Sequence, residues 1–468
     1  MLQKAKFTFV VLLTAVLLYG CGEAPAEQVN TANVMEGNST EETAVVIELQ
    51  GDTAVLDGQA IEEFEYTWHS DPAKTEEWYE GTEPNTENKA YIAHDIWYYP
   101  ELNEDGFSKV EYDGENEWAY HYTAEGYTDF IYATLPIQGE TVPTEMMHSA
   151  KEAYDNPVLH ITKPGTYILQ GNWNGQIMID LGEKEETFQD DNAKVKLILN
   201  GVDVNCTVAP AFVAYSAFEC DNGWEEREEY SNAVNTEEAG IAIEIADNSV
   251  NNFSGTNIYR MLKPEYKKEG STVQKKLRKI DGAFYSFVSM NLNGQEKETG
   301  ILNITSGFEG LDDELHLTIH SGNINIYAQN DGINVNEDGV SVFTMNGGTV
   351  HIFAGLGAEG DGIDSNGFIV VNGGMIAGGT PSGSDELLDS DCGNTVNGGE
   401  VITIGSSRGF GMGEGEFGKE PPMGFDKEPP EGFEQGRRSF GDENFRSRDL
   451  PEEFKKEVPG GDAPKESN

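Results

Sequence analysis

The chain has 468 residues, with 83 Asp and Glu against 30 Lys and Arg, and its formal net charge is −53 at pH 7. The electrostatic field of such an acidic protein repels nucleic acid and anionic membrane surfaces, and we expect neither as a partner. Cations are the natural ligands. Glycine accounts for 54 residues without a Gly-X-Y period, which excludes collagen and favours a turn-rich all-β architecture.

The N-terminus has the pattern of a bacterial secretion signal. A short basic start precedes the apolar run Phe7–Leu18, which is too short to span a bilayer. Shortly after the run, the small residue Gly20 directly precedes Cys21. We therefore expect residues 1–20 to be cleaved and Cys21 to carry a lipid on the outer face of the cell membrane. The alternative is an ordinary cleaved signal with an incidental cysteine. Residues 21–44 are small and polar, as in a tether.

A repeat with a constant period dominates the second half of the chain. Ile-His-Ser-Gly, Met-Asn-Gly-Gly and two copies of Val-Asn-Gly-Gly occupy residues 319–322, 345–348, 371–374 and 396–399. Their last glycines are 26, 26 and 25 residues apart, and short alternating β-branched runs follow. Alternation predicts strands, Gly after Asn predicts a tight turn, and the period predicts stacked coils of a parallel β-helix. We assign residues 45–58 and 158–407 to this solenoid.

Residues 59–157 interrupt the solenoid and hold four of the six tryptophans, including Trp97 and Trp118. One interpretation is a small β subdomain with its own aromatic core. The other is a platform whose exposed rings stack on the C–H faces of sugars.

A second insertion near residues 259–279 is strongly basic. It contains eight of the 30 basic residues of the chain. Four of them, Lys275, Lys276, Arg278 and Lys279, are candidates for contact with a polyanionic glycan. The alternative is solvated loop charge without a role in binding.

Three cysteines follow Cys21, at positions 206, 220 and 392. Export permits disulfides, and the short spacing favours a Cys206–Cys220 pair. The C-terminal residues 408–468 consist of Gly, Pro, Phe and charged residues, which cannot bury a core, so we expect a disordered tail. Its scattered Phe residues are either solvated or bind a protein partner of unknown identity.

Acidic residues recur just before the strands of each repeat, in Glu-Gly-Leu-Asp, Asp-Gly-Ile-Asn and Asp-Gly-Ile-Asp, and more loosely in Glu-Leu-Leu-Asp. Equivalent positions of successive coils stack, so the first and fourth members should form two columns. Stacked carboxylates repel one another, and residues 301–407 contain 15 acidic residues and no Lys or Arg. Either the carboxylates are solvated, or a hard cation neutralises them, and calcium suits oxygen ligands best. The predicted metal ligands are Glu309, Asp312, Asp331, Asn334, Asp361, Asp364, Asp389 and Asp391.

Several blocks resemble a family of bacterial secreted carbohydrate-binding domains. They are GDGIDSNG (360–367), IVVNGG (369–374), NDGINVNEDGVSV (330–342), ITKPGTYILQGNWNGQIMIDLGE (161–183) and LILNGVDVNC (197–206). The resemblance implies an all-β, right-handed, single-stranded parallel β-helix similar in fold to pectate lyases. It also implies association with calcium and binding to cell-wall polysaccharides such as cellulose and polygalacturonate.

Three functions remain open at this point. The first is a lipid-anchored surface protein that binds polysaccharide with calcium. The second is an enzyme on acidic polysaccharide: a calcium-dependent lyase, which needs an Arg or Lys base that the acidic coils lack, or a hydrolase, which needs two carboxylates. The third is a structural role as a calcium-stiffened spacer. The acidic residues repeat from coil to coil, which favours ion binding over a single catalytic centre.

Overall fold

The computed structural model describes residues 44–64, 66–71, 76–81, 87–98, 119–122, 128–133, 147–221, 231–258, 262–267, 274–276, 280–357, 360–381 and 385–404. All of them belong to the compact unit Glu42–Asn468. The predicted signal peptide, the predicted lipidation site Cys21, nearly all of the predicted tether and the C-terminal residues 408–468 lie outside the described residues. Within the described part, no helix is long and apolar enough to cross a membrane.

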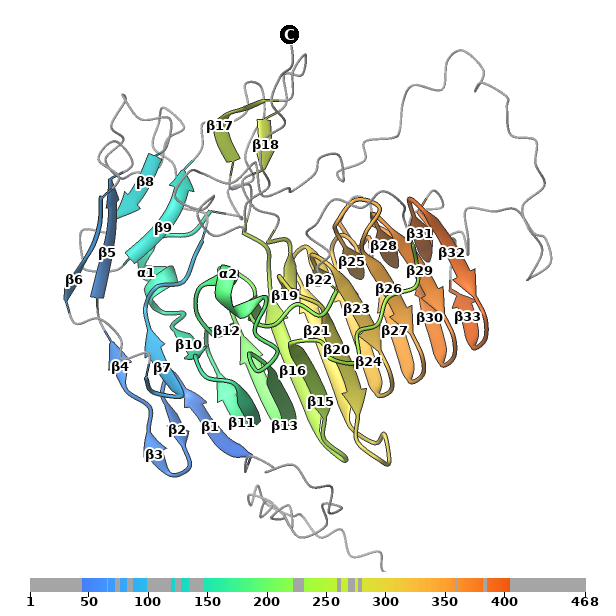
Figure 1. The fold of residues 1–468 in the computed structure, drawn as a ribbon, viewed down its shortest axis with the longest axis horizontal. Coiled ribbons are helices and arrows are strands. Elements are labelled where there is room, and N and C mark those ends of the chain that lie inside the picture. The colour runs from blue at the N-terminus through green and yellow to red at the C-terminus, as the bar shows by residue number, and fades with distance from the viewer. Residues whose placement is uncertain are drawn as a thin grey trace, which may run out of the picture. The chain divides into compact units, whose positions relative to one another are not determined.

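The described body is all-β and consists of three parallel ladders (Figure 1). The first and second ladders belong to one 17-stranded sheet, and the third is a ten-stranded sheet. The first ladder comprises β1 (Val45–Gly51), β11 (Gly165–Trp173), β13 (Val195–Asn205), β15 (Ile241–Ile245), β20 (Met290–Gly294), β23 (His316–Ile319), β26 (Val342–Met345), β29 (Phe368–Val371) and β32 (Gly393–Val396). The second continues from the end of β13 through β16 (Val250–Gly255), β21 (Ile301–Ser306), β24 (Asn323–Ala328), β27 (Thr349–Phe353), β30 (Met375–Gly379) and β33 (Glu400–Thr403).

The third ladder comprises β4 (Glu63–Phe64), β7 (Ala90–Ala93), β10 (Val158–Ile161), β12 (Gln176–Asp180), β14 (Phe212–Ser216), β19 (Gly282–Ser286), β22 (Glu309–Asp313), β25 (Ile333–Val335), β28 (Ile363–Ser365) and β31 (Leu388–Ser390). Two short helices, α1 (Ala150–Tyr154) and α2 (Lys184–Thr187), lie between strands. Three two-stranded sheets complete the described part: β5 (Tyr66–Asp71) with β6 (Glu76–Gly81), β8 (Ala119–Tyr122) with β9 (Thr128–Ala133), and β17 (Leu262–Lys267) with β18 (Gln274–Lys276).

Successive coils visit the three ladders in turn, and from β10 onward each strand of a ladder pairs in parallel with its equivalent in the next coil. On the first ladder, Thr318 pairs with Thr344, Thr344 with Val370, and Val370 with Thr395. The steps are 26, 26 and 25 residues, so the period predicted from the sequence is confirmed. The parallel solenoid is confirmed in this form, while its right-handed, single-stranded winding stays a prediction.

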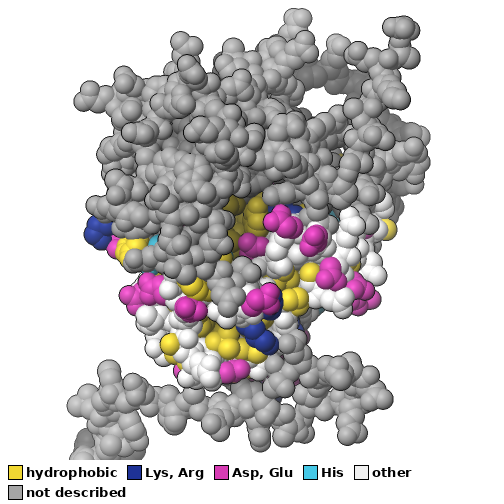
Figure 2. All heavy atoms as spheres, turned by 60° about the vertical axis from the view of Figure 1, so that its left-hand side comes forward, with side chains coloured by type: hydrophobic (Ala, Val, Ile, Leu, Met, Phe, Trp, Pro, Cys, Tyr) yellow, Lys and Arg dark blue, Asp and Glu magenta, His cyan; other side chains and the backbone are white. Residues whose placement is uncertain are grey.

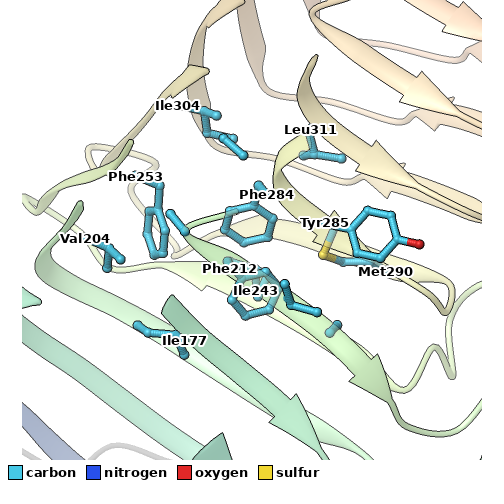
Figure 3. Packing of buried hydrophobic residues seen from close by; sticks show 14 of the residues in the cluster. Ile177, Val204, Phe212, Ile243, Phe253, Phe284, Tyr285, Met290, Ile304 and Leu311 are labelled. Carbon is cyan, nitrogen blue, oxygen red and sulfur yellow. The ribbon is translucent and has the colours of Figure 1, made fainter. Parts of the chain in front are cut away.

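Alternation along each strand directs one set of side chains into a continuous core. On β24, for example, Ile324 and Ile326 are buried while Tyr327 is exposed. Figure 3 shows a part of this core in which Phe284 stacks on Phe212, with ring centroids 4.1 Å apart, and forms a T-shaped contact with Phe253 at 5.2 Å. The burial of apolar surface along this core is the main force that holds the coils together.

The Asn-Gly-Gly turns need glycine because of both backbone conformation and crowding. Gly348 has a φ of +81°, and a Cβ there would lie 2.6 Å from the carbonyl oxygen of Gly322 in the preceding coil. A side chain at this position would strain the turn and separate the two coils.

The predicted boundary of the aromatic insertion at 59–157 is wrong in part. β3 (Gln59–Ala60) pairs with β2 (Ala54–Leu56), and β7 joins the third ladder by antiparallel pairing with β10. Ile96 and Tyr98 are fully buried in the main core. β4, β7, Ile96 and Tyr98 therefore extend the third ladder and the main core at the N-terminal end of the solenoid.

Candidate functional site

The fourth-position column predicted from the sequence is present on the third ladder. Asp312 on β22 pairs with Asn334 on β25, Asn334 pairs with Asp364 on β28, and Asp364 pairs with Asp389 on β31. In-register neighbours of a parallel ladder point to the same side and are about 4.8 Å apart. Three carboxyl groups and one amide therefore follow one another along the solenoid.

The first-position column is present as well. The Gly310 N–H donates to the carbonyl oxygen of Asp331 at 2.9 Å, and the Gly332 N–H donates to that of Asp361 at 3.0 Å. The same bond links Gly362 to the next coil. Because the bonding pattern repeats, Glu309, Asp331, Asp361 and Glu386 occupy equivalent points of consecutive coils.

Carboxylates of this column also bind backbone, which the sequence did not reveal. Asp331 Oδ1 accepts the N–H of Asp361 at 2.6 Å, and Asp361 Oδ1 accepts the N–H of Glu386 at 2.6 Å. Each side chain thus fixes the start of the strand in the following coil. The two columns are linked to one another where Asn334 Nδ2 donates to Glu309 Oε1 at 3.1 Å.

The columns are buried at one end and open at the other. Asp312 is fully buried, Glu309, Asp331 and Asn334 are less than 9% exposed, and Asp389 is exposed. Asp391 is also exposed and follows β31, outside both columns. Its role as a metal ligand therefore stays a prediction, separate from the two columns.

Burial raises the pKa of three carboxyl groups in the columns, those of Asp312, Asp331 and Asp361. For Asp312 burial is the largest cause, and the nearby carboxylates of Glu309 and Glu314 raise its pKa further. For Asp331 burial is again first, followed by Asp364 and Glu309. The pKa of Asp361 rises to about 8, chiefly through burial. Carboxyl groups with these pKa values need either a proton or a cation at neutral pH.

The donor atoms of the columns suit a hard cation, but they do not form a closed cage. Carboxylate and amide oxygens are the ligands of calcium, and the buried Asn334 Oδ1 has no hydrogen-bond partner. In the part of the chain that the structure describes, no three His, Cys, Asp or Glu side chains form a ready metal site. A cation between the coils would therefore need amide oxygens, water or ligand oxygens besides the carboxylates.

A second buried acidic group lies beside the columns and was missed from the sequence. Asp313 is fully buried, its Oδ1 accepts the N–H of Leu315 at 2.9 Å, and its Oδ2 has no partner. Burial raises its pKa, with a further contribution from Glu219. Glu219 accepts the N–H and Oγ–H of Ser289 at 2.7 and 2.9 Å, so it anchors a loop against the first ladder. In the sequence, only the adjacent pair Asp312 and Asp313 could have indicated this second acidic group.

The residues predicted to contact glycan are only partly placed. Trp97 is half-buried against the main core and meets Tyr215 edge-on, with ring centroids 5.6 Å apart, and its contact with glycan stays a prediction. Lys275 and Lys276 are on β18, which is described by its backbone alone. Trp118, Arg278 and Lys279 lie outside the described residues.

The predicted disulfide is wrong, because Cys206 and Cys220 are both free thiols. Cys206 precedes β14 and Cys220 follows it, so five extended residues lie between them. β14 alone extends over about 16 Å, more than the roughly 7 Å between Cα atoms that a disulfide can bridge. Burial raises the pKa of both thiols to about 12, which makes them unreactive.

Acidic side chains are spread over the described surface in Figure 2, with fewer Lys and Arg among them. The outward side of the second ladder differs, because its exposed residues include Tyr327 and Phe353 and no charged residue from β16 to β30. These rings are not among the residues predicted from the sequence. They are 26 residues apart, so the repeat itself was the available signal.

Comparison with known proteins identifies a relationship for the C-terminal coils. Residues 225–419 match the model of a family described as carbohydrate-binding domain-containing protein. This stretch is similar to carbohydrate-binding domains. It holds both carboxylate columns and the second ladder from β16 onward. The resemblance predicted from the sequence is confirmed to this extent, while its calcium and pectate-lyase aspects stay predictions.

A search of the curated proteins finds no match. Among solved structures, a match is the polysaccharide lyase-like protein from C. thermocellum, determined as a gadolinium derivative. The identity is 23% and the TM-score 0.34, over 54% of this chain and 86% of the other.

Proposed function

We propose that this chain is a polysaccharide-binding protein of the bacterial cell surface, with the solenoid as its binding scaffold. The observation that carries the proposal is the match of residues 225–419 to a carbohydrate-binding domain family. Regular coils support it, because a solenoid presents the same kind of side chain at regular intervals along a polymer. The lipobox-like sequence before Cys21 supports anchoring of the protein to the membrane by a lipid.

Calcium is part of the proposal. The residues that would hold it are Asp331, Asn334, Asp361 and Asp364, where the two columns run between coils. The raised pKa of Asp361 shows that its carboxylate is unfavourable without a counter-charge, and a bound divalent cation would supply that positive charge. Binding would therefore stiffen the coils and, at the open end near Asp389, leave room for oxygen ligands from a glycan.

Binding is favoured over cleavage by the chemistry around the columns. β-Elimination from a uronate needs a base within hydrogen-bond reach of the proton beside the carboxylate. The described strands from β22 to β33 contain no Lys or Arg, and the carboxylates of the columns hold backbone N–H groups. A lyase or hydrolase activity is the alternative that the test below must detect.

The test is a binding screen of the full mature chain against neutral and acidic polysaccharides, with and without excess EDTA. Absorbance of unsaturated products and new reducing ends are followed in the same wells. We expect saturable binding to at least one polysaccharide, weaker after chelation, without new products. Absence of binding to every polysaccharide would overturn the proposal, and steady release of products would replace it with an enzyme.

A further inference from the structure

We propose that the outward face of β24 and β27 binds a neutral polysaccharide chain, with Tyr327 and Phe353 as its stacking residues. The inference rests on the proposed function and adds the place of binding and the charge class of the glycan. This face is separate from the carboxylate columns, which lie on the third ladder.

The two rings form an exposed pair. Tyr327 and Phe353 are register partners on β24 and β27, and their rings are offset-stacked, with centroids 5.6 Å apart and planes 13° apart. Tyr327 is 47% exposed and Phe353 is 36% exposed. Leu356, whose N–H bonds to Ala328 at the end of β24, is 45% exposed. A contiguous apolar patch of this kind on a polar surface marks a binding site, and aromatic faces match the C–H faces of sugar rings.

A row of amides borders the rings. Asn325 and His351 are two residues before Tyr327 and Phe353, so they lie on the same side of the sheet. Asn303 Nδ2 donates to Asn252 Oδ1 at 2.9 Å, Asn325 Nδ2 donates to Asn303 Oδ1 at 2.8 Å, and Asn325 Oδ1 accepts from His351 Nδ1 at 3.0 Å.

This row leaves hydrogen-bonding capacity toward the outside. Each amide nitrogen has a second N–H, each amide oxygen has a second lone pair, and His351 keeps Nε2 as an acceptor when Nδ1 donates. The donors and acceptors of this row can bind the hydroxyl groups of a sugar, while the neighbouring aromatic rings contact its C–H faces.

Charge selects a neutral glycan. The outward positions of β16, β21, β24, β27 and β30, judged by alternation, are Val250, Asn252, Ser254, Ile301, Asn303, Thr305, Asn323, Asn325, Tyr327, Thr349, His351, Phe353, Met375, Ala377 and Gly379, of which Ala377 and Gly379 are buried. None is Asp, Glu, Lys or Arg, in a chain of net charge −53. The first carboxylate appears on β33, at the exposed Glu400. Five strands span about 19 Å, enough for a stretch of linear polymer. The negative charge of the surrounding protein would repel a polyuronate, and this face has no cation to offset that repulsion. A neutral chain would not be repelled.

The experiment is calorimetric titration of the full mature chain with cellohexaose, mannohexaose, xylohexaose and hexagalacturonate. Tyr327→Ala and Phe353→Ala remove the rings, and Tyr327→Phe and Phe353→Tyr retain them. Val55→Ala is the control, because Val55 is a partly exposed apolar residue on β2, outside the second ladder. Thermal melting checks that each variant is folded.

We expect the wild type to bind at least one neutral hexasaccharide. Each alanine substitution should weaken that affinity about tenfold, equivalent to about 1.4 kcal/mol, while the conservative and control variants retain it. If neutral-glycan binding is unchanged by both alanine substitutions, Tyr327 and Phe353 are not the binding residues, and the proposed function still stands. If the protein binds hexagalacturonate and no neutral hexasaccharide, the proposal of a neutral-glycan face is likewise wrong and the proposed function still stands. Absence of binding to any of the four sugars, together with a negative polysaccharide screen, would overturn both.

Discussion

Asp331 and Asp361 are joined by a hydrogen bond of 2.6 Å, in which the Asp361 N–H donates to Asp331 Oδ1. The Asp361 carboxylate in turn accepts the N–H of Glu386. Side chains that repel one another as anions therefore also hold the backbone of successive coils in place. The stability of this part of the solenoid depends on what neutralises their charge.

Without a cation, stability should fall as the pH rises. Folding raises the pKa of Asp361 from 3.8 to about 8 and also raises those of Asp312 and Asp331. Between these values the folded state binds more protons than the unfolded state. The stabilisation is thus complete below the unfolded pKa and is lost as the pH rises through the folded pKa.

Melting temperatures in EDTA between about pH 5 and about pH 8 measure this loss. Asp361→Asn should reduce the slope because it removes one of the titrating groups, and Asp391→Asn, an exposed residue outside the columns, should leave it unchanged. A melting temperature that rises over this range would contradict the assignment.

Calcium should stabilise the fold and displace protons as it binds. At neutral pH a cation between the columns must replace protons held by carboxyl groups of raised pKa, so binding releases protons. Calcium at 100 times its dissociation constant adds about 2.7 kcal/mol per site to the free energy of unfolding. Titration calorimetry in two buffers of different ionisation enthalpy measures the released protons. Asp361→Asn and Asp364→Asn should weaken calcium binding, whereas equal affinity in Asp391→Asn and in these variants would show that the columns hold no metal.

Two substitutions of Asp331 separate its charge from its hydrogen bond. Asp331→Asn keeps an oxygen for the Asp361 N–H and removes a buried charge, so in EDTA near pH 8 it should be at least as stable as the wild type. Asp331→Ala leaves that N–H without its acceptor, which costs about 1–3 kcal/mol. Urea unfolding measures both. Equal destabilisation by Asn and Ala would mean that the carboxylate does not act through this bond.

Two glycines with positive φ values, one in an Asn-Gly-Gly turn and one in β13, allow a matched pair of substitutions. Gly348 and Gly201 have φ values of +81° and +78°, but a Cβ would clash with Gly322 only at Gly348, while Gly201 has nothing within 4 Å. Gly201→Ala should cost about 1–2 kcal/mol from backbone strain alone. Gly348→Ala should cost clearly more in urea unfolding. Similar costs would show that crowding between coils is unimportant.

Much of the solenoid was predictable because its repeats carry local signals. The spacing of Gly322, Gly348, Gly374 and Gly399 gave the coil length, and the register of Asp312, Asn334, Asp364 and Asp389 followed from equivalent positions. Alternation also separated the inward Ile324 and Ile326 from the outward residues of β24. These features depend on neighbours in the sequence or on the next coil.

Other features depended on tertiary contacts that no local pattern reports. Residues 90–98 were read as part of an insertion, yet β7 pairs with β10 and Tyr98 enters the main core. Spacing suggested a Cys206–Cys220 disulfide, but β14 separates the two thiols. Burial of Asp313 depends on the loop that holds Glu219, and the exposure of Tyr327 and Phe353 was visible only once the outward side of the second ladder was known.

The central claim is that this solenoid binds polysaccharide without cleaving it. The most direct measurement is a saturation isotherm of the full mature chain on a panel of neutral and acidic polysaccharides, with calcium present and products assayed in the same samples. The account predicts a saturable isotherm for at least one polysaccharide and no increase in unsaturated products or reducing ends. A flat isotherm for every polysaccharide, or products that accumulate with time, would contradict it.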